Sequence, residues 1–326
     1  MQAIVLREHG DPSVLRLSEH PDPAPAPGEV VVELKAAALN RRDTGVRKGA
    51  YGDYPLPFVL GSDGAGIRRD TGEEVVILPS LAWGDREEAP GPDFRILGGP
   101  DDGTYAELIT APAANLYPKP KRLSWHEAAA FPLAGLTAYR ALFARARVRY
   151  GETVLVLGVG SGVSTFAISL AYRAGCRVLV TSSSDEKLVA ARELGAHGGA
   201  NYTRGDWVAE VRELAGDGGI DVVVDSVGTT WPDSIRCLRP GGRVVVFGAT
   251  GGSAVELQIR PVYMSQVSML GTTMGSPRDF AGLLRALEPE GVHPVVDSVR
   301  PLAETAAAHE RLESGTHFGK LVLEIG

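Results

Sequence analysis

Residues 153–187 place a glycine-rich turn between two apolar segments, and this pattern constrains the fold more than any other in the chain. Residues 153–157 have the β-branched, apolar composition of a buried strand, and residues 158–164 follow as GVGSGVS. Apolar residues then recur at helical spacing up to Gly175, and a second apolar strand begins at once over residues 178–181. A strand, a turn, a helix and a strand in this order form a βαβ unit, whose two strands are parallel.

The glycine turn lies where a dinucleotide-binding fingerprint would lie. The backbone N–H groups of such a turn and of the helix that follows it bind a pyrophosphate. The third glycine of the usual fingerprint is replaced by Ser164, which is still small enough for close packing of helix and strand. The alternative is a tight structural turn that binds no ligand. The residues predicted to bind the pyrophosphate are Gly158, Gly160, Ser161, Gly162 and Val163.

The residues after the second strand distinguish the two common dinucleotides. An NAD site carries an acidic residue there, which binds the ribose 2′-hydroxyl. This chain instead has four hydroxyl residues at 181–184, and the acids at 185–186 are typical of a first helical turn. Hydroxyl and ammonium groups bind a 2′-phosphate, whereas a carboxylate repels it. The sequence therefore predicts NADPH rather than NADH, with contacts from Thr181, Ser182, Ser183 and Lys187.

Composition and charge restrict the class of protein. The 326 residues suffice for two domains with separate cores. The net charge of −7 and the lack of a basic stripe argue against a nucleic-acid partner. No apolar run reaches the roughly 20 residues of a membrane span, and the N-terminus does not resemble a signal peptide. Two distant cysteines, Cys176 and Cys237, suggest a reducing compartment, so a cytoplasmic location is expected.

The chain changes character along its length, which predicts two domains. Residues 1–120 carry short β patterns around a polar, glycine- and proline-rich loop at 37–66, and residues 121–275 alternate helices and strands. The alternation predicts an α/β domain with a doubly wound parallel sheet. The last strand, from residue 320, comes too late to extend that sheet, so residues 276–326 are assigned to the first domain. Functional candidates in the loop are Asn40, Arg41, Asp43, Tyr51, Ser62 and Asp63.

At this point the chain resembles the medium-chain dehydrogenase/reductase superfamily, and within it the zinc-free quinone oxidoreductase (ζ-crystallin-like) branch. The resemblance covers nearly the whole length, through ALNRRDTGVRKGAY, PFVLGSDGAG, GTYAEL, FPLAGLTAYRAL, VLVLGVGSGVSTFAI, GANY and FGKLVLEI. It implies a GroES-like β domain, a Rossmann domain, an active site in the cleft between them, and a homodimer. The apolar strand near residues 267–273 is a candidate for pairing with its copy in the dimer.

The resemblance also shows where this chain departs from the zinc alcohol dehydrogenases. The positions that match their catalytic zinc ligands are Asn40, Ser62 and Leu133, and the four-cysteine lobe of those enzymes is missing. An amide, a hydroxyl and an alkyl group cannot replace the thiolate and imidazole ligands that Zn²⁺ requires. We therefore expect no metal in the reaction.

Further site residues follow from the resemblance alone. It implies that Asn40 and Tyr51 line the substrate pocket, and that Gly45 replaces a second pocket tyrosine, which leaves more room. It adds Tyr202 to the 2′-phosphate contacts. The backbone expected to hold the nicotinamide comprises Val227, Gly248, Ala249, Thr250, Gly271, Thr272 and Thr273.

The expected reaction is hydride transfer from NADPH to a quinone or an α,β-unsaturated carbonyl compound. Without a Lewis acid, an alkoxide is poorly stabilised, and these acceptors need less help than a simple aldehyde. Asn40 would polarise the acceptor oxygen, and Tyr51 is a candidate proton donor. Arg41 and Asp63 are expected to form a structural ion pair. Two alternatives remain open, a zinc-type alcohol dehydrogenase and a non-catalytic NADPH-binding protein.

Overall fold

The computed structural model describes residues 1–326 except 53 and 289–290, and it divides the chain into two compact units. Unit 1 comprises Met1–Ala134, Ser276–Glu288 and Pro294–Gly326, and unit 2 comprises Gly135–Gly275 with a short segment that ends at His293. The sequence assigned residues 121–134 to the second domain, whereas this division assigns them to unit 1. The reason is that α2 (Trp125–Ala130) packs against β3 (Glu29–Ala38), β5 (Asp63–Arg68) and β18 (Lys320–Glu324).

Unit 2 is built on a six-stranded sheet in which every strand pair is parallel. The strand order is β13-β12-β11-β14-β15-β16, so the order reverses between β11 and β14. Ligands bind beyond the carboxyl ends of the strands at such a reversal. The predicted doubly wound α/β fold is thereby confirmed. The strands are β11 (Thr153–Val156), β12 (Arg177–Ser182), β13 (Gly198–Asn201), β14 (Ile220–Asp225), β15 (Leu238–Val246) and β16 (Ser268–Gly271).

Helices connect the strands of unit 2 close to their predicted positions. The glycine turn leads into α4 (Gly162–Arg173), and α5 (Asp185–Glu193) follows β12. Next come α6 (Trp207–Ala215) and α7 (Trp231–Cys237), while α8 (Ile259–Met264) was not predicted. Before the glycine turn, α3 (Pro132–Tyr139) is continued by a wider π-helical turn, Arg140–Arg145. No helix in the described part of the chain is long and apolar enough to cross a bilayer.

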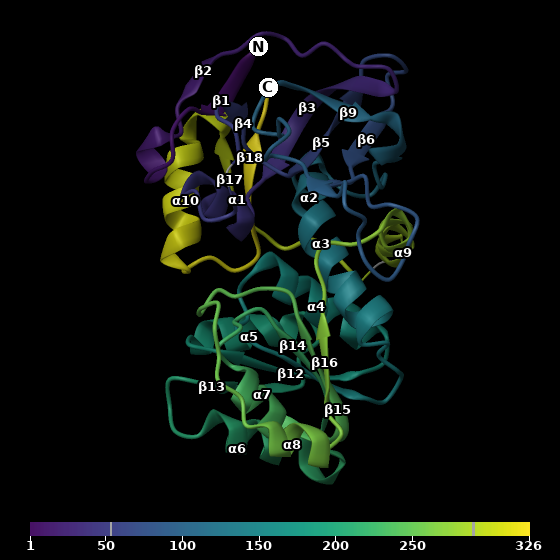
Figure 1. Cartoon of the computed structure of the whole chain (residues 1–326), viewed down its shortest axis with the longest axis vertical. Coiled ribbons are helices and arrows are strands. Elements are labelled where there is room, and N and C mark those ends of the chain that lie inside the picture. Colours follow the sequence, from purple (N-terminus) through teal and green to yellow (C-terminus); the bar gives the residue numbers. More distant parts are fainter. Residues whose placement is uncertain (53, 289–290) are drawn as a thin grey trace. The chain divides into compact units, whose positions relative to one another are not determined.

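Unit 1 contains the β domain, which the end of the chain completes. Strand β18 pairs with β3, with Val322 opposite Ala38, and β17 (Val296–Pro301) lies beside it (Figure 1). The sequence predicted the return of β18 to the β domain but not its partner. The strand β17 was not predicted. The main sheet has the order β10-β6-β5-β3-β18-β17, with β9 also paired to β3. Its other strands are β6 (Glu74–Ile77), β9 (Leu108–Pro112) and β10 (Leu116–Pro118). Smaller sheets contain β1 (Gln2–Leu6), β2 (Leu17–Glu19), β4 (Phe58–Val59), β7 (Ser80–Leu81) and β8 (Arg95–Ile96).

A helix occupies part of the segment that the sequence indicated as loop. Residues Arg41–Arg47 form α1, and Asn40 is its N-cap. The Asp43 carboxylate accepts a hydrogen bond from the Asn40 backbone N–H at 2.8 Å, which completes the first turn. The loop interpretation was wrong here because the many glycines and prolines around α1 concealed this capping signal.

Helix α10 (Thr305–Ser314) lies against α1 (Figure 1). It carries a buried histidine, His309. The His309 ring is fully buried and meets the Tyr105 ring edge-on, with 6.1 Å between centroids. Neither of its ring nitrogens has a hydrogen-bond partner among the described residues. Burial, together with the Arg47 guanidinium, lowers the pKa of His309 from its ordinary 6.5 to about 3. His309 is therefore neutral in the folded chain at neutral pH.

This lowered pKa predicts a loss of stability in mild acid. Between pH about 3 and 6.5, unfolded His309 binds a proton that folded His309 does not, so unfolding becomes easier as the pH falls through this window. We expect His309→Phe to show a smaller drop in the urea midpoint of unit 1 between pH 7 and pH 5 than the native chain. His9→Gln, at an exposed histidine, is the control and should behave like the native chain. Equal drops in all three proteins would contradict the prediction.

Candidate functional site

The glycine turn of unit 2 is held in shape by Thr181 at the end of β12. Gly158 and Gly160 have φ values of 64° and 133°, which glycine tolerates far better than other residues. The Gly158 N–H donates to the Thr181 hydroxyl at 3.1 Å, and the Val159 N–H donates to the Thr181 carbonyl at 2.8 Å. Thr181, predicted to bind the 2′-phosphate, is buried and fixes the turn instead.

Ser164, which replaces the third glycine, adds hydrogen bonds to the same turn. Its hydroxyl accepts from the Gly160 N–H at 3.1 Å and donates to the Ser161 carbonyl at 2.8 Å. The Ser161 side chain caps α4 by accepting from the Ser164 N–H. The first N–H groups of a helix have no acceptor within the helix, and the helix dipole favours an anion at this end. Gly162 and Val163 open α4, so the turn fits a pyrophosphate.

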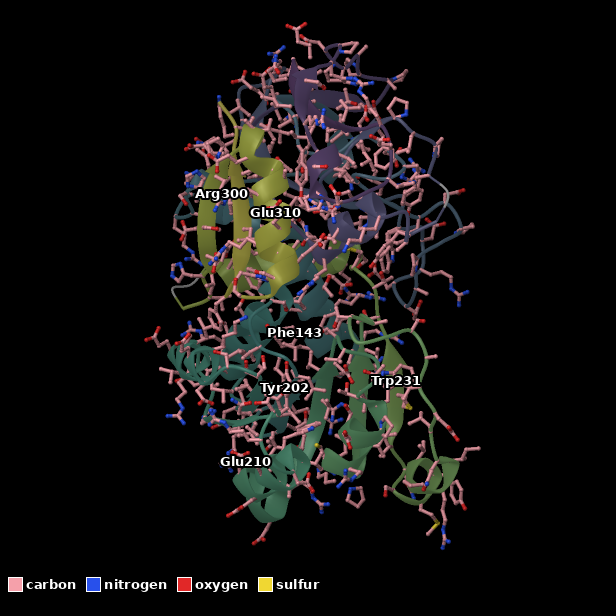
Figure 2. All side chains as sticks on the ribbon, turned by 90° about the vertical axis from the view of Figure 1, so that its left-hand side faces the viewer. Phe143, Tyr202, Glu210, Trp231, Arg300 and Glu310 are labelled. Atoms are coloured by element: carbon pink, nitrogen blue, oxygen red, sulfur yellow. The ribbon has the colours of Figure 1, made fainter. Side chains whose placement is uncertain are left out.

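Some of the residues predicted to bind a 2′-phosphate are buried, and others are exposed. Ser182 is buried, and its hydroxyl accepts from the Ser184 N–H, while the Ser184 hydroxyl caps α5. Ser183 is exposed, Lys187 is partly exposed, and Tyr202 is 45% exposed on unit 2 (Figure 2). The Tyr202 N–H donates to the Ser182 carbonyl at 3.0 Å, which brings Tyr202 to the end of β12. These three side chains are at least partly exposed, and the Ser182 backbone holds Tyr202 in place.

The acid nearest this site is already engaged. Asp185 accepts hydrogen bonds from the Asn201 amide at 2.8 Å and from the Arg204 guanidinium. The Asn201 hydrogen bond, followed by that of Arg204, lowers the pKa of Asp185. Asp185 therefore stays ionised but has its hydrogen-bonding capacity directed to protein groups. This agrees with its interpretation as a first-turn residue.

A buried carboxylate that the sequence analysis missed organises the other end of the site. Asp225, at the end of β14, accepts from the backbone N–H groups of Val227 and Gly228 and from the hydroxyls of Thr230 and Ser234, at 2.7–3.1 Å. The Val227 loop in turn binds the next loop, since Thr250 donates to Ser226 and Gly251 to Val227. An acid directly after a buried strand, before a Ser/Thr-rich turn, is the sequence signal that could have identified Asp225.

These loops border an apolar pocket of about 250 Å³ at the carboxyl ends of β15 and β16. Gly248, Gly271 and Thr272, all predicted to contact the nicotinamide, are among its lining residues. At Gly248, a Cβ atom would lie 2.8 Å from the Ser226 carbonyl oxygen, so a larger residue would displace the loop. The remaining lining residues are Trp231, Val246, Phe247, Met269 and Leu270.

Unit 1 holds a buried polar cluster around Asn40. The Asn40 Nδ2 donates to Asp63 Oδ2 at 2.9 Å, and Lys320 Nζ donates to Asn40 Oδ1 at 2.7 Å and to Asp63 Oδ2 at 2.8 Å. Lysine can only donate and an ionised carboxylate can only accept, so these two partners fix the orientation of the amide. Asp63 Oδ1 also accepts from the Leu133 N–H at 2.7 Å. Lys320, from the FGK motif, was not predicted as a site residue.

The expected ion pair between Arg41 and Asp63 is wrong. Arg41 is exposed on α1, and Asp63 pairs with Lys320. The sequence could not identify Lys320 as the partner of Asp63, because only the pairing of β18 with β3 brings Lys320 to this position. Arg42, next to Arg41 in the chain, is buried and donates to the backbone carbonyls of residues 96–99.

A second carboxylate, Asp43, lies in the same cluster. Besides capping α1, it accepts from the Tyr105 hydroxyl at 2.8 Å, and Ser62 lies at 3.4 Å. Burial raises the pKa of Asp43, with Arg42 opposing the rise, and burial also raises the pKa of Tyr105 well above its usual 10. Tyr105 is thus a hydrogen-bond donor at neutral pH. Asp43 is a structural residue here rather than a solvent-accessible acid.

The positions that match zinc ligands do not fit a zinc ion. The Asn40 amide is engaged by Lys320 and Asp63, the Ser62 hydroxyl donates to the Leu97 carbonyl at 2.8 Å, and Leu133 offers no side-chain ligand. An ammonium group 2.7 Å from Asn40 Oδ1 would also repel a cation. Over residues 1–52, 54–288 and 291–326, no group of three or more His, Cys, Asp and Glu side chains is placed to hold a metal ion.

Tyr51 fills the room that the glycine at position 45 leaves. A Cβ atom on Gly45 would overlap the Tyr51 ring, so the ring packs directly over the α1 backbone. The Tyr51 side chain is otherwise 53% exposed. The space beside Gly45, expected to be open, therefore holds the Tyr51 ring.

Comparison with known proteins gives a separate family match for part of each unit. A family model described as an alcohol dehydrogenase GroES-like domain matches residues 26–121, and one described as a zinc-binding dehydrogenase matches residues 162–289. A zinc-type alcohol dehydrogenase-like protein of Schizosaccharomyces pombe is 38% identical, over 92% of this chain and 91% of its own. The quinone oxidoreductase of Rattus norvegicus is 34% identical, over 99% and 97%. A crystal structure described as an NAD-dependent alcohol dehydrogenase has a TM-score of 0.95 and 44% identity, covering both chains completely.

The hydrogen bonds of Asp225 predict a large stabilising contribution in unit 2. Asp225→Ala leaves two backbone N–H groups and two hydroxyls without their acceptor, and we expect a loss of about 3 kcal/mol or more in unfolding free energy. Urea unfolding followed by the fluorescence of Trp207 and Trp231 measures it. Asp217→Ala, at an exposed acid of the same unit, is the control, with a change below about 0.5 kcal/mol. A similar loss in both variants would contradict the role given to Asp225.

Proposed function

The chain belongs to the medium-chain dehydrogenase/reductase superfamily, and we propose that it transfers a hydride from NADPH to a quinone or an α,β-unsaturated carbonyl compound without zinc. That it is an oxidoreductase with a nicotinamide cofactor follows from the family. The proposal of zinc-free hydride transfer rests on one observation. Lys320 and Asp63 hold the Asn40 amide at the position that matches a zinc ligand in the zinc enzymes.

The residues of unit 2 account for cofactor binding. The N-terminus of α4 and the glycine turn would bind the pyrophosphate, and Ser183, Lys187 and Tyr202 would bind the 2′-phosphate. The nicotinamide backbone contacts would come from Val227, from 248–250 and from 271–273. When bound, NADPH supplies the hydride. One similar structure is described as NAD-dependent, so NADH is the alternative that the cofactor experiment below must separate.

In unit 1, Asn40 would orient and polarise the acceptor oxygen. One N–H of its Nδ2 donates to Asp63, and the second has no acceptor among the described residues. We assign that second N–H to the substrate oxygen, where negative charge develops as the hydride arrives. Tyr51, half-exposed over Gly45, would donate the final proton, or solvent would.

Quinones and enones suit this site because they delocalise the negative charge that develops when they accept a hydride. A neutral amide donor gives less stabilisation to an alkoxide than a metal ion does, so an unactivated aldehyde would react poorly. Relatives named quinone oxidoreductase support the acceptor class. The relative named zinc-type keeps the zinc alcohol dehydrogenase as an alternative, and a non-catalytic NADPH-binding protein is the other.

We further propose that the protein is cytoplasmic and forms a homodimer. One feature supports the location and another supports the dimer. Both cysteines are free and buried, which suits a reducing compartment. Strand β16 is an edge of the parallel sheet, and α8 before it exposes Ile259, Tyr263 and Met264. An edge strand beside exposed apolar side chains is a favourable surface for pairing with a second copy.

The reaction class is tested by NADPH oxidation with metal-stripped protein and three acceptors, a quinone, an enone and a simple aldehyde. We expect turnover of the quinone and the enone and little of the aldehyde, with no gain from added Zn²⁺. Aldehyde turnover that requires Zn²⁺ would instead identify a zinc enzyme. Tight NADPH binding with no turnover of any acceptor would favour the non-catalytic alternative.

The choice of NADPH is tested at Lys187. Removing an ammonium group that binds phosphate costs roughly 1.5–3 kcal/mol, so Lys187→Ala should raise the Kd of NADPH at least tenfold. The Kd of NADH, which lacks the 2′-phosphate, should change little. Lys121→Ala, at an exposed lysine of unit 1, is the matched control. A native chain that already binds NADH more tightly would overturn the NADPH assignment.

A further inference from the structure

The contacts of Lys320 give it a part in the reaction as well as in the fold. It lies at the start of β18, and its side chain is only 3% exposed. Its ammonium group touches two acceptors, the Asn40 amide oxygen at 2.7 Å and Asp63 Oδ2 at 2.8 Å. Lys320 and Asp63 could neutralise each other's charge without Asn40. The additional hydrogen bond from Lys320 to the Asn40 amide therefore calls for a separate explanation.

The three groups form a closed ring of hydrogen bonds. Lys320 donates to Asn40 Oδ1, Asn40 Nδ2 donates to Asp63 Oδ2, and Lys320 also donates to that same oxygen. An isolated amide can rotate by 180° and exchange its oxygen and nitrogen at little cost, because the two ends have similar size. In this ring the rotated amide would direct N–H groups at an ammonium and oxygen at a carboxylate. Only one orientation is compatible with both partners.

The ammonium also changes the amide electronically. A charged donor on the amide oxygen withdraws electron density from the nitrogen, and hydrogen bonds in a chain strengthen one another in a low-dielectric interior. The second Nδ2 N–H of Asn40 thereby becomes a stronger donor. The charge of Lys320 reaches the reacting oxygen through the amide, although the ammonium itself is held away by its two acceptors.

We propose that Lys320 is a positioning residue, which orients Asn40 and strengthens its free N–H as donor to the acceptor oxygen. The inference rests on the proposed function, since it needs Asn40 to contact the substrate. The alternative is a purely structural Lys320, which stabilises the sheet and leaves the chemistry unchanged.

The test measures kcat and KM of metal-free, full-length protein with NADPH against 2-cyclohexenone and 1,4-benzoquinone. Removing one donor to a developing oxyanion costs roughly 10²–10³-fold in kcat, so we expect losses of this size for Asn40→Ala with the enone. Lys320→Met should lose at least about tenfold in kcat with the enone through a weakened, mobile amide, with the Kd of NADPH unchanged. The double variant should be no slower than Asn40→Ala alone, because Lys320 acts through Asn40.

The comparison of acceptors separates positioning from structure. Benzoquinone is strongly electrophilic and needs less polarisation, so both single variants should lose clearly less with it than with the enone. A structural defect would lower both rates by the same factor. Equal losses with the two acceptors, or a double variant clearly slower than Asn40→Ala alone, would overturn the proposal.

Two more variants cover the case that Lys320→Met does not fold. Asp63→Asn combined with Lys320→Met removes both charges and keeps an amide partner for Asn40, so it should fold and still lose rate with the enone. Lys320→Arg keeps the charge and should retain more enone rate than Lys320→Met. Full enone activity in the charge-free double variant would refute the role of the ammonium. If the native chain reduces neither acceptor, the proposed function itself fails, which is a distinct result.

Discussion

The buried contact of Lys320 with Asp63 and Asn40 holds together three segments that are far apart in the chain. Asp63 opens β5, Asn40 caps α1 directly after β3, and Lys320 opens β18. Removing one partner of a buried pair leaves an uncompensated charge, so the three elements must assemble together. Unit 1 therefore requires the last residues of the chain. The segment that forms most of unit 2 is inserted between two parts of one β domain.

Unit 2 follows a different principle, since its site is made mainly of backbone. The glycine turn, the Val227 loop and the loop after β15 present N–H and carbonyl groups at the carboxyl edge of one parallel sheet. Side chains such as Thr181, Ser164 and Asp225 are directed at this backbone and fix it. A site of this kind is preorganised by buried hydrogen bonds, and only a few exposed side chains remain to select between cofactors. That explains why Thr181 and Ser182, two of the predicted 2′-phosphate contacts, are buried and accept hydrogen bonds from the backbone.

Local and periodic signals predicted most of the fold. The βαβ unit has a strong sequence signal, and the structure contains it, whereas the return of the last strand to the β domain was inferred only from its late position in the chain. The failures concern α1, β17 and the partner of Asp63. The partner of Asp63 could not be predicted because the pairing of β18 with β3 decides it, and nothing local encodes that pairing. The glycine-rich fingerprint was predictable, whereas the role of Asp225 depended on loops whose paths the sequence does not specify.

The balance of charge around Asn40 bears on the range of acceptors. Lys320 is paired with Asp63 in this buried region, and Arg42 donates to the Ser62 hydroxyl and to backbone carbonyls. A zinc ion acts on the substrate oxygen directly as a Lewis acid, whereas here the ammonium of Lys320 is paired with the Asp63 carboxylate. A full negative charge on oxygen would gain little from this pair, because the attraction of the ammonium is offset by the repulsion of the Asp63 carboxylate. A single directed N–H is useful only when the substrate delocalises the charge itself. The same charge balance that allows these groups to be buried thus restricts the proposed reaction to acceptors that are already activated.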